Sequence, residues 1–445
     1  MVDGMDFCVF RIGLLAFSAV LLTGCDGDAP TPPPAQDFLA RHWVDPLPPQ
    51  GMPPKSFSPL EASLSPSACG ECHAEQYQDW RTSLHSRAVG PGLLWQLKLM
   101  DQEQANRCLR CHAPLAEQKA LLALEHGWPG APSQPPPAYV DAGLGHAGLV
   151  CAACHLRAHR HFGPPARGRK ERGGVASDGS QSSSMPSPAA AVGGDRSTTS
   201  LYAPHGGFVT STAFSDSRFC AHCHQFPDDG PRINGKLQED TYRQWQASPQ
   251  AREKNCQSCH MPDRKHLWRG IHDPEMTRRA LEISLRLSDL GAGRYAAQAH
   301  VRNVGAGHHF PTYMVPKVDL IFMRHDAAGR AQEVGRQVIG WTVDTGITRE
   351  IADTRIPAGE SREFIQPFSA PPGTNWRLEL VVRVRPGEHY ERVFMHSLTQ
   401  AEALPAAALP QLKLALSRVR AAEYELLRVS ARPGLSGTFN AETRP

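Results

Sequence analysis

The chain has 445 residues, of which 40% are hydrophobic and 20% are charged, and its formal net charge is only +3. That charge is too small to indicate a nucleic-acid-binding protein. The sequence has no run of 18 or more apolar residues, which excludes a multi-span membrane protein. The 38 glycines and 39 prolines predict many turns. The 12 cysteines are the most informative residues, because ten of them occur in one repeated pattern.

Residues 1–24 are predicted to be a bacterial lipoprotein signal peptide. A short apolar segment over residues 12–22 follows Arg11 and is too short to span a bilayer. It leads into the sequence Leu-Thr-Gly-Cys, which resembles the bacterial lipobox, so we expect Cys25 to be lipidated and to become the first mature residue. Asp26 favours the periplasmic side of the inner membrane over the outer membrane. The alternative is an ordinary cleaved signal peptide with a chance cysteine.

Residues 25–60 are predicted to be a proline-rich tether. Ten prolines occur between Pro30 and Pro59, and a segment of this composition behaves as an extended spacer. A lipid on Cys25 followed by this spacer would hold the folded part of the protein away from the membrane.

Residues 61–275 contain five copies of the motif C-x-x-C-H, which is the signature of covalent c-type haem attachment. Two thiols on one helical turn can bond to the two vinyl groups of a porphyrin, and the histidine that follows becomes the proximal iron ligand. A disulfide framework and a zinc ribbon are poorer explanations, because neither needs a histidine after every second cysteine. The attachment cysteines are Cys69, Cys72, Cys108, Cys111, Cys151, Cys154, Cys220, Cys223, Cys256 and Cys259, and the proximal histidines are His73, His112, His155, His224 and His260.

The spacing of the motifs predicts one compact haem domain. Their first cysteines are 39, 43, 69 and 36 residues apart, so we expect the five haems to touch and to form a relay. The long third interval contains residues 164–200, which are rich in glycine, serine and proline and are predicted to be a disordered insert. The expected architecture is a mainly α and loop multihaem cytochrome domain, wrapped on five covalently bound haem c groups.

The distal ligands decide between an electron carrier and an enzyme. An iron with histidine on both axial sides can only pass electrons, whereas an open sixth position lets a substrate reach the iron. Sequence context suggests seven histidines as candidate distal ligands, and Met276 or Met314 as alternatives. These histidines are His85, His205, His266, His308, His159, His272 and His146.

His308 lies in a loop that joins the haem region to the rest of the chain. The loop interrupts a strand-like pattern, and Gly305 and Gly307 permit a close backbone approach to a flat cofactor. We therefore expect it to reach back, so that His308 ligates a haem of the preceding domain. An exposed turn is the alternative.

The run from Cys69 to His85, the segment Cys256–Pro262 and the motif spacing resemble the multihaem cytochrome c superfamily, which contains hydroxylamine oxidoreductase and the pentahaem nitrite reductases. The resemblance covers residues 65–275 and implies haem ligands only. Similar Gly-His-x-x-Pro-Thr segments follow the haem region in related multihaem cytochromes, which favours His308 over His309. The nitrite reductases have lysine in place of the proximal histidine at the active-site haem. All five motifs here have histidine, and this argues against nitrite reduction.

The last third of the chain is predicted to be a separate domain. Alternating apolar residues, as in Leu281, Ile283 and Leu285, predict an antiparallel β-sandwich over residues 276–405. A terminal helix is expected over 406–430 and a tail over 431–445. No catalytic residue can be assigned in this third, so we expect a binding or packing module.

The predicted function is that of a membrane-tethered pentahaem cytochrome in a bacterial cell envelope, which relays electrons between redox partner proteins. One alternative is a reductase of a small nitrogen or sulfur oxyanion, acting at one five-coordinate haem. Another is a filament subunit whose haem chain continues into neighbouring copies. The sequence gives no indication of a nucleic-acid partner.

Overall fold

The computed structural model describes residues 34–157, 160–163, 204–371, 375–433 and 439–440. The predicted signal peptide, the lipidation site Cys25, the insert at 164–200 and the candidate ligand His159 lie outside these residues. Among the helices that are described, none is both long and apolar enough to cross a membrane.

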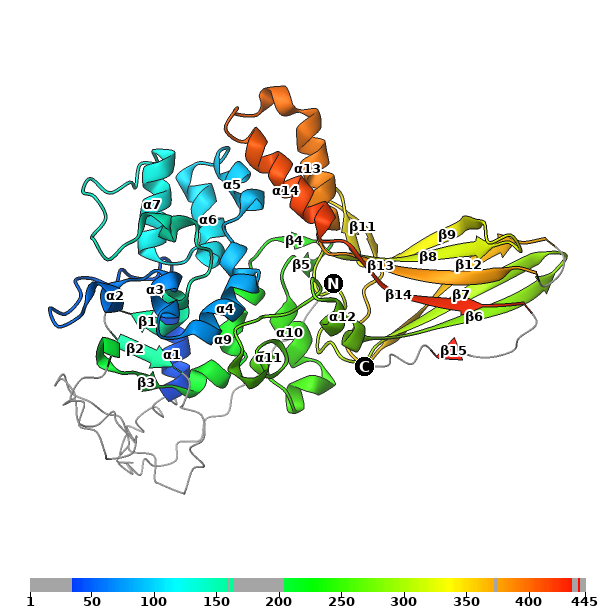
Figure 1. Cartoon of the computed structure of the whole chain (residues 1–445), viewed down its shortest axis with the longest axis horizontal. Helices are drawn as coiled ribbons and strands as arrows, with labels where there is room; N and C mark the ends of the chain where they lie inside the picture. The colour runs from blue at the N-terminus through cyan, green and yellow to red at the C-terminus, as the bar shows by residue number, and fades with distance from the viewer. Residues whose placement is uncertain (1–33, 158–159, 164–203, 372–374, 434–438, 441–445) are drawn as a thin grey trace, which may run out of the picture.

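The amino-terminal part consists of short helices joined by loops (Figure 1). One of the two longest begins at a capping box, in which Asp101 accepts a hydrogen bond from the Gln104 amide at 2.8 Å. The helices are α1 (Pro34–His42), α2 (Pro59–Ala62), α3 (Pro66–Gly70), α4 (Ala74–Thr82), α5 (Pro91–Leu97), α6 (Gln102–His112), α7 (Ala116–His126), α8 (Cys151–His155), α9 (Arg218–His224), α10 (Thr241–Gln246), α11 (Cys256–His260) and α12 (Pro274–Ala280). Short strands accompany them: β1 (Leu156–Arg157), β2 (Arg160–Gly163), β3 (Val209–Thr210), β4 (Arg232–Ile233) and β5 (Lys236–Leu237).

The carboxy-terminal part contains two four-stranded sheets, in the orders β12-β7-β6-β15 and β14-β13-β8-β9, and every strand pair in them is antiparallel. Side chains from both sheets share one large hydrophobic core. The prediction of antiparallel sheets is therefore confirmed. The elements are β6 (Leu281–Gly291), β7 (Arg294–Asn303), β8 (Lys317–His325), β9 (Ala331–Ile339), β10 (Trp341–Val343), β11 (Glu350–Asp353), β12 (Ser361–Ser369), β13 (Arg377–Arg385), α13 (Glu388–Thr399), α14 (Leu409–Ala421), β14 (Tyr424–Ala431) and β15 (Phe439–Asn440).

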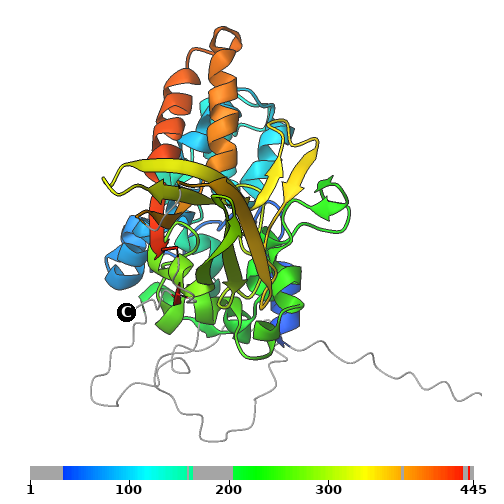
Figure 2. The ribbon, with the colours of Figure 1, turned by 90° about the vertical axis from the view of Figure 1, so that its right-hand side faces the viewer.

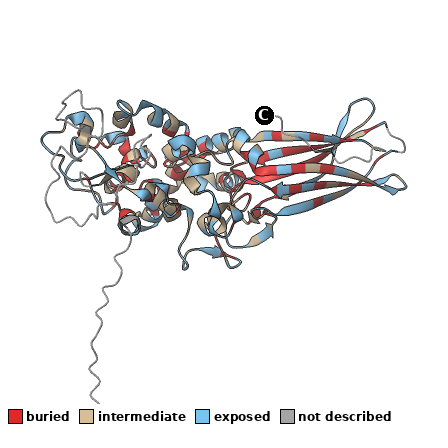
Figure 3. Ribbon diagram, turned by 90° about the horizontal axis from the view of Figure 1, so that it is seen from below, coloured by how far each residue is buried: buried red, intermediate tan, exposed pale blue. Residues whose placement is uncertain are grey.

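Burial differs between the two parts, as Figure 3 shows. Buried residues follow the strands of the sheets, whereas in the helical part they are interrupted by exposed and half-buried stretches. The helical part has small separate apolar clusters, such as one around Leu47, Leu115 and Leu144 and another around Leu97, Leu109 and Leu122. A haem supplies a large apolar surface of its own, so a haem-binding polypeptide needs fewer apolar side chains in its core.

Of the tether predicted over residues 25–60, the structure describes residues 34–60, and these are not a simple extended spacer. Pro34 begins helix α1, where proline is well tolerated because the first helical amide has no partner. The Trp43 indole donates a hydrogen bond to the Phe219 carbonyl at 3.0 Å, and Leu47 is fully buried against the segment that contains Leu115. Burial of these apolar side chains outweighs the proline content of the segment.

The terminal helix predicted over 406–430 is also only partly correct. The helix α14 ends at Ala421, and β14 then pairs with β13, for example Leu427 with Val382. No glycine or proline marks this change, and pairing with a neighbouring strand overrides the helical spacing of the leucines. The sandwich region predicted over 276–405 also contains an unpredicted helix, α13. It packs with α14 as a hairpin against α5 of the helical part, as seen in Figures 1 and 2.

Candidate haem sites

Each C-x-x-C-H motif lies on or beside one short helical segment: α3 with the start of α4, the end of α6, α8, the end of α9, and α11. A single helical turn presents the two cysteines and the histidine toward the same side, as attachment to one porphyrin requires. Nine of the ten motif cysteines, all but Cys154, are free thiols in the described chain, the form that can bond to vinyl groups.

Thiols of different motifs lie in contact. The Cys69 thiol is hydrogen-bonded to that of Cys151, which links the first motif to the third. A similar bond joins Cys111 to Cys223, which links the second motif to the fourth. Another joins Cys220 to Cys256, which links the fourth motif to the fifth.

Cys154 of the third motif lies close enough to Cys220 and Cys223 to raise the pKa of both. The third motif is therefore also a neighbour of the fourth. All five attachment sites form one connected group, with the fourth motif at its centre.

Four of the five proximal histidines face a second histidine from a distant part of the chain. In each pair the two imidazole rings have centroids 6.2–6.5 Å apart. The pairs are His73 with His205, His155 with His266, His224 with His85, and His260 with His308.

This separation fits an iron atom between the rings. On each side of the iron, a metal–imidazole bond of about 2.1 Å and a distance of about 1.1 Å from the nitrogen to the ring centre add up. The two sides together give roughly 6.4 Å between the ring centroids. The pair that joins the helical part to the carboxy-terminal part, His260 and His308, is the most parallel, with an interplanar angle of 10°. The residues present therefore fit haem with histidine on both axial sides.

Hydrogen bonds fix the orientation of several of these imidazoles. The Nδ1 atom of His260 lies 2.6 Å from the Arg269 carbonyl, that of His266 lies 3.0 Å from the Arg264 carbonyl, and that of His308 lies 2.8 Å from the His309 carbonyl. Because a carbonyl only accepts, Nδ1 must donate, and the lone pair on Nε2 stays available for a metal.

Burial also keeps these side chains neutral. It lowers the pKa of His85 to about 3 and that of His308 to about 4. Neutral imidazole is the form that binds a metal. The Nδ1 atom of His85 is buried without a hydrogen-bond partner among the described residues, and such an atom in a folded protein calls for an explanation. A cofactor bound beside His85 would explain why this nitrogen has no partner among the described protein atoms.

The loop that carries His308 depends on its glycines. A Cβ atom on Gly305 would lie 2.3 Å from the Arg279 carbonyl oxygen, which is closer than side-chain atoms approach backbone. A Cβ atom on Gly307 would press against Trp245 and Gln250 at 3.2–3.3 Å. The glycines thus let this loop pack tightly against the helical part and place His308 opposite His260.

His112 of the second motif is the exception. Its Nδ1 atom lies 2.6 Å from the Ala88 carbonyl and donates to it. The Nδ1 atoms of His260, His266 and His308 donate to backbone carbonyls in the same way. Within the residues that the structure describes, no ring contact joins His112 to a second histidine. The second motif therefore differs from the other four, in which the proximal histidine faces the imidazole of a second histidine.

The remaining candidate ligands are placed differently. The His146 Nε2 atom makes a 2.6 Å ion pair with Glu125, which occupies the nitrogen that an iron would need. His272 lies near Arg87, which lowers its pKa together with burial, and no ring contact between it and a proximal histidine occurs in the described chain. Met314 packs in an apolar cluster around Trp341.

Sequence reasoning missed an aromatic residue between two of the sites. The indole of Trp268 lies edge-on to His85, at 4.6 Å between centroids, and also to His266, at 5.2 Å. Its backbone has a φ of 44°, which is rare for a bulky residue. Nothing in the local sequence marks Trp268 as a contact of two distal ligands, since both contacts depend on the tertiary fold.

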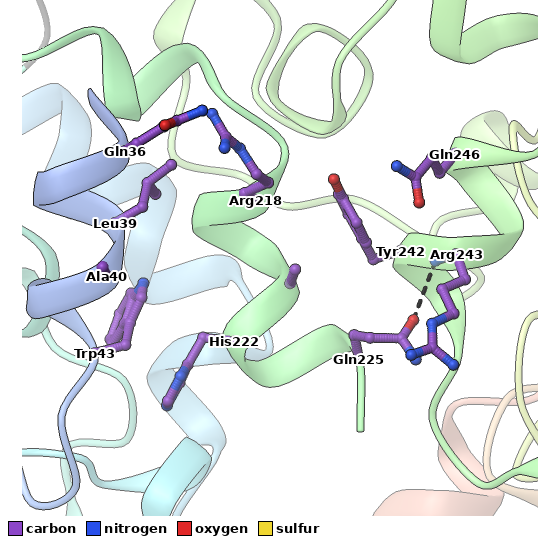
Figure 4. Close-up of a pocket in the computed structure, with 11 residues that line it drawn as sticks. Gln36, Leu39, Ala40, Trp43, Arg218, His222, Gln225, Tyr242, Arg243 and Gln246 are labelled. Carbon is purple, nitrogen blue, oxygen red and sulfur yellow. Dashed lines mark hydrogen bonds between the residues drawn. The ribbon is translucent and has the colours of Figure 1, made fainter. Parts of the chain in front are cut away.

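A pocket of about 600 Å³ lies beside the fourth motif, between α1, α9 and α10 (Figure 4). Its wall includes His222, one of the two residues between the cysteines of the fourth motif, which stacks on Trp43 with centroids 5.2 Å apart. None of the described residues that line it is a motif cysteine or a proximal histidine. The pocket thus borders the fourth motif without including the residues that would attach or ligate its haem.

Comparison with known proteins agrees with this geometry. The model of the family "Cytochrome c554 and c-prime" matches residues 68–130, which span the first two motifs. A penta-heme cytochrome c552 from Thermochromatium tepidum has a similar fold, with a TM-score of 0.53 and 18% identity, over 84% of this chain and 100% of that one. The two matches support a multihaem cytochrome c.

Two other comparisons add nothing further. Northeast Structural Genomics Consortium target SoR45 matches 23% of this chain and 70% of its own, with 10% identity and a TM-score of 0.15, too low to support an argument. No curated protein sequence matches the chain. The family match and the penta-heme neighbour support covalently bound haem c and a role in electron transfer.

Proposed function

We propose that this multihaem cytochrome carries five haems and relays electrons between redox partner proteins in a bacterial cell envelope, where a lipid on Cys25 anchors it to the periplasmic face of the inner membrane. The observation that supports the relay most directly is the set of four histidine pairs at 6.2–6.5 Å. Histidine on both axial sides closes an iron to substrates and leaves electron transfer as its chemistry.

In this proposal His205, His266, His85 and His308 are the distal ligands of the first, third, fourth and fifth haems. The thiol contacts between motifs support short distances between neighbouring haems. What the chain's own residues contribute is to hold the imidazoles in place through backbone carbonyls and to exclude water around them.

Two measurements test the relay. The intact mass of the mature protein is expected to correspond to five haems, and electron paramagnetic resonance of the oxidised protein is expected to show low-spin signals from four of them. A mass for four haems or fewer, in a host with a working maturation system, contradicts the proposal. Cys25→Ser is expected to release soluble, haem-loaded protein, whereas continued membrane association would show that another anchor exists.

A second candidate function rests on His112. With no histidine opposite it among the described side chains, the haem of the second motif has a distal face that a small molecule could reach. This arrangement supports reduction of a small nitrogen or sulfur compound there, with electrons supplied by the other four haems. A high-spin signal that shifts when a small ligand is added is the expected observation, and five unresponsive low-spin signals contradict it.

A further inference from the structure

The loop that carries His308 is organised by the side chain of Asn303. This residue ends β7 and is fully buried. Its amide nitrogen donates to the His308 carbonyl at 2.8 Å and to the Ile356 carbonyl at 3.1 Å. Its amide oxygen accepts from the Ala306 amide at 3.0 Å. Buried backbone groups in a loop need such partners, because water does not reach them. One side chain therefore closes the loop from its beginning to His308.

Gln244 of α10 holds the same part of the loop from the helical side. Its side-chain oxygen accepts from the His309 amide at 3.1 Å and from the Thr312 hydroxyl at 3.0 Å. The His309 amide and the His308 carbonyl belong to one peptide group. That peptide group is thus fixed at both ends, by one amide side chain from each part of the chain.

The next peptide group, between His309 and Phe310, is also fixed at both ends. The Phe310 amide donates to the Ile356 carbonyl at 2.9 Å, the same oxygen to which Asn303 donates. The His309 carbonyl accepts from Nδ1 of His308 at 2.8 Å. The ring of His308 is therefore attached to a backbone that cannot tilt without breaking these hydrogen bonds.

The ring planes agree with this arrangement. His308 lies at an interplanar angle of 10° to His260, whereas the angle is 36–47° in the other three histidine pairs. Hydrogen-bond partners of a metal-binding histidine fix the orientation of its ring and tune the metal. The pair with nearly parallel rings is thus the one in which the backbone of the distal histidine is held from both parts of the chain.

We infer that Asn303 and Gln244 are positioning residues for the haem of the fifth motif. They hold the peptide group that follows His308, so that its ring stays nearly parallel to that of His260. This inference rests on the proposed function, in which these two histidines are the axial ligands of that haem. It adds that the orientation of the distal ligand, and with it the reduction potential of this haem, depends on one amide side chain from each part of the chain.

Electron paramagnetic resonance of the oxidised full-length holoprotein tests the inference. The largest g value of a low-spin haem rises as its two axial imidazoles turn away from parallel. The signal of the fifth haem is identified as the one that disappears in His308→Ala. Gln244→Met removes the acceptor of the His309 amide but keeps the size of the side chain. It is expected to raise the largest g value of this signal and to shift the potential of this haem, while the haem stays low-spin.

Two further substitutions in α10 separate positioning from packing. Gln244→Glu keeps an oxygen that accepts from the His309 amide, so it is expected to restore the wild-type g value. Gln246→Met is the matched control on the same helix, because Gln246 is exposed and lies on the wall of the pocket in Figure 4. It is expected to leave the spectrum unchanged. Low-spin signals from the first, third and fourth haems verify folding of each variant.

Asn303→Asp tests the other end of the peptide group. It keeps the shape of the side chain but turns an oxygen, in place of the donor, toward two carbonyls, so the g value of the fifth haem is expected to rise at least as far as in Gln244→Met. If no signal disappears in His308→Ala, the ligand assignment in the proposed function is refuted. If a signal disappears there but keeps its g value in Gln244→Met and in Asn303→Asp, only the present inference is overturned. The same holds if Gln244→Glu shifts the signal as far as Gln244→Met does.

Discussion

The indole of Trp268 lies edge-on to the imidazole of His85, with ring centroids 4.6 Å apart. The same indole meets His266 at 5.2 Å and 89°. One side chain therefore supports two of the histidines proposed as distal ligands, those that face the proximal histidines of the third and fourth motifs. Side chains that hold a metal ligand in place matter nearly as much for a site as the ligand itself.

Replacement of Trp268 is expected to disturb two haems together. In Trp268→Ala, His85 and His266 lose a rigid neighbour, so the reduction potentials of the third and fourth haems should shift while those of the first and fifth stay close to wild type. Spectroelectrochemical titration measures this. Trp128→Ala is the matched control, because Trp128 stacks on His126 at 4.6 Å rather than on a paired histidine. Equal shifts in both variants would contradict a specific role for Trp268.

The pairing of His260 with His308 predicts that the two parts of the chain share one haem. His308→Ala is expected to remove one low-spin signal and to produce a high-spin one, because no other described histidine faces His260. The control is His309→Ala, which removes the adjacent imidazole and should keep all low-spin signals. Unchanged signals and potentials in His308→Ala would show that the loop is only a neighbour of the haem.

A buried lysine predicts a pH dependence of stability in the carboxy-terminal part. Lys317 is 2% exposed, donates to the Met314 carbonyl at 2.6 Å and lies 3.5 Å from Glu388, with Arg392 and Arg385 nearby. Burial lowers the pKa of Lys317 from 10.5 to about 8. Between these values the unfolded chain binds a proton that the folded chain does not, so the free energy of unfolding rises with pH in this window.

The rise is expected to reach up to about 3 kcal/mol above pH 10 relative to pH 7. Denaturant titrations of wild type and Lys317→Met at several pH values isolate the effect, since the substitution removes it. Lys413→Met serves as the control, because Lys413 is exposed on α14. If the free energy of unfolding changes with pH in the same way for the wild type and for Lys317→Met, Lys317 is not the source of the pH dependence.

The shared core of the two sheets predicts a large cost for a cavity there. Leu380 is fully buried on β13, between Phe322 of β8 and Val429 of β14. Leu380→Ala should lower the free energy of unfolding by about 2–5 kcal/mol. Ile365→Ala, at a position that is 51% exposed, should change it by no more than about 0.5 kcal/mol. Far-ultraviolet circular dichroism in denaturant follows the sheets.

The haem attachment sites could be predicted from sequence because the motif is local. Two cysteines and a histidine within five residues carry the chemistry without help from the fold. The distal partners are different, since His85 faces His224 across 139 positions. Context suggested the four histidines that the structure places opposite proximal ones, but it could not say which motif each would face.

Other features depended on the tertiary structure alone. Leu427 fits a helical spacing as well as a strand, and only pairing with Val382 decides between them. Similarly, His112 has the same sequence motif as the other proximal histidines. What distinguishes it among the described residues is that no second histidine ring contacts it, and only the tertiary fold decides this.

The central position of the fourth motif has a consequence for how electrons move. Its cysteines on α9 contact the second and fifth motifs, and Cys154 brings the third beside it. An electron that enters at the first or third haem must cross the fourth to reach the second or the fifth. The route is a junction with branches rather than a wire with two ends. Loss of the fourth haem would separate the first and third from the second and from the fifth, whereas loss of the first, second or fifth would leave the rest in communication.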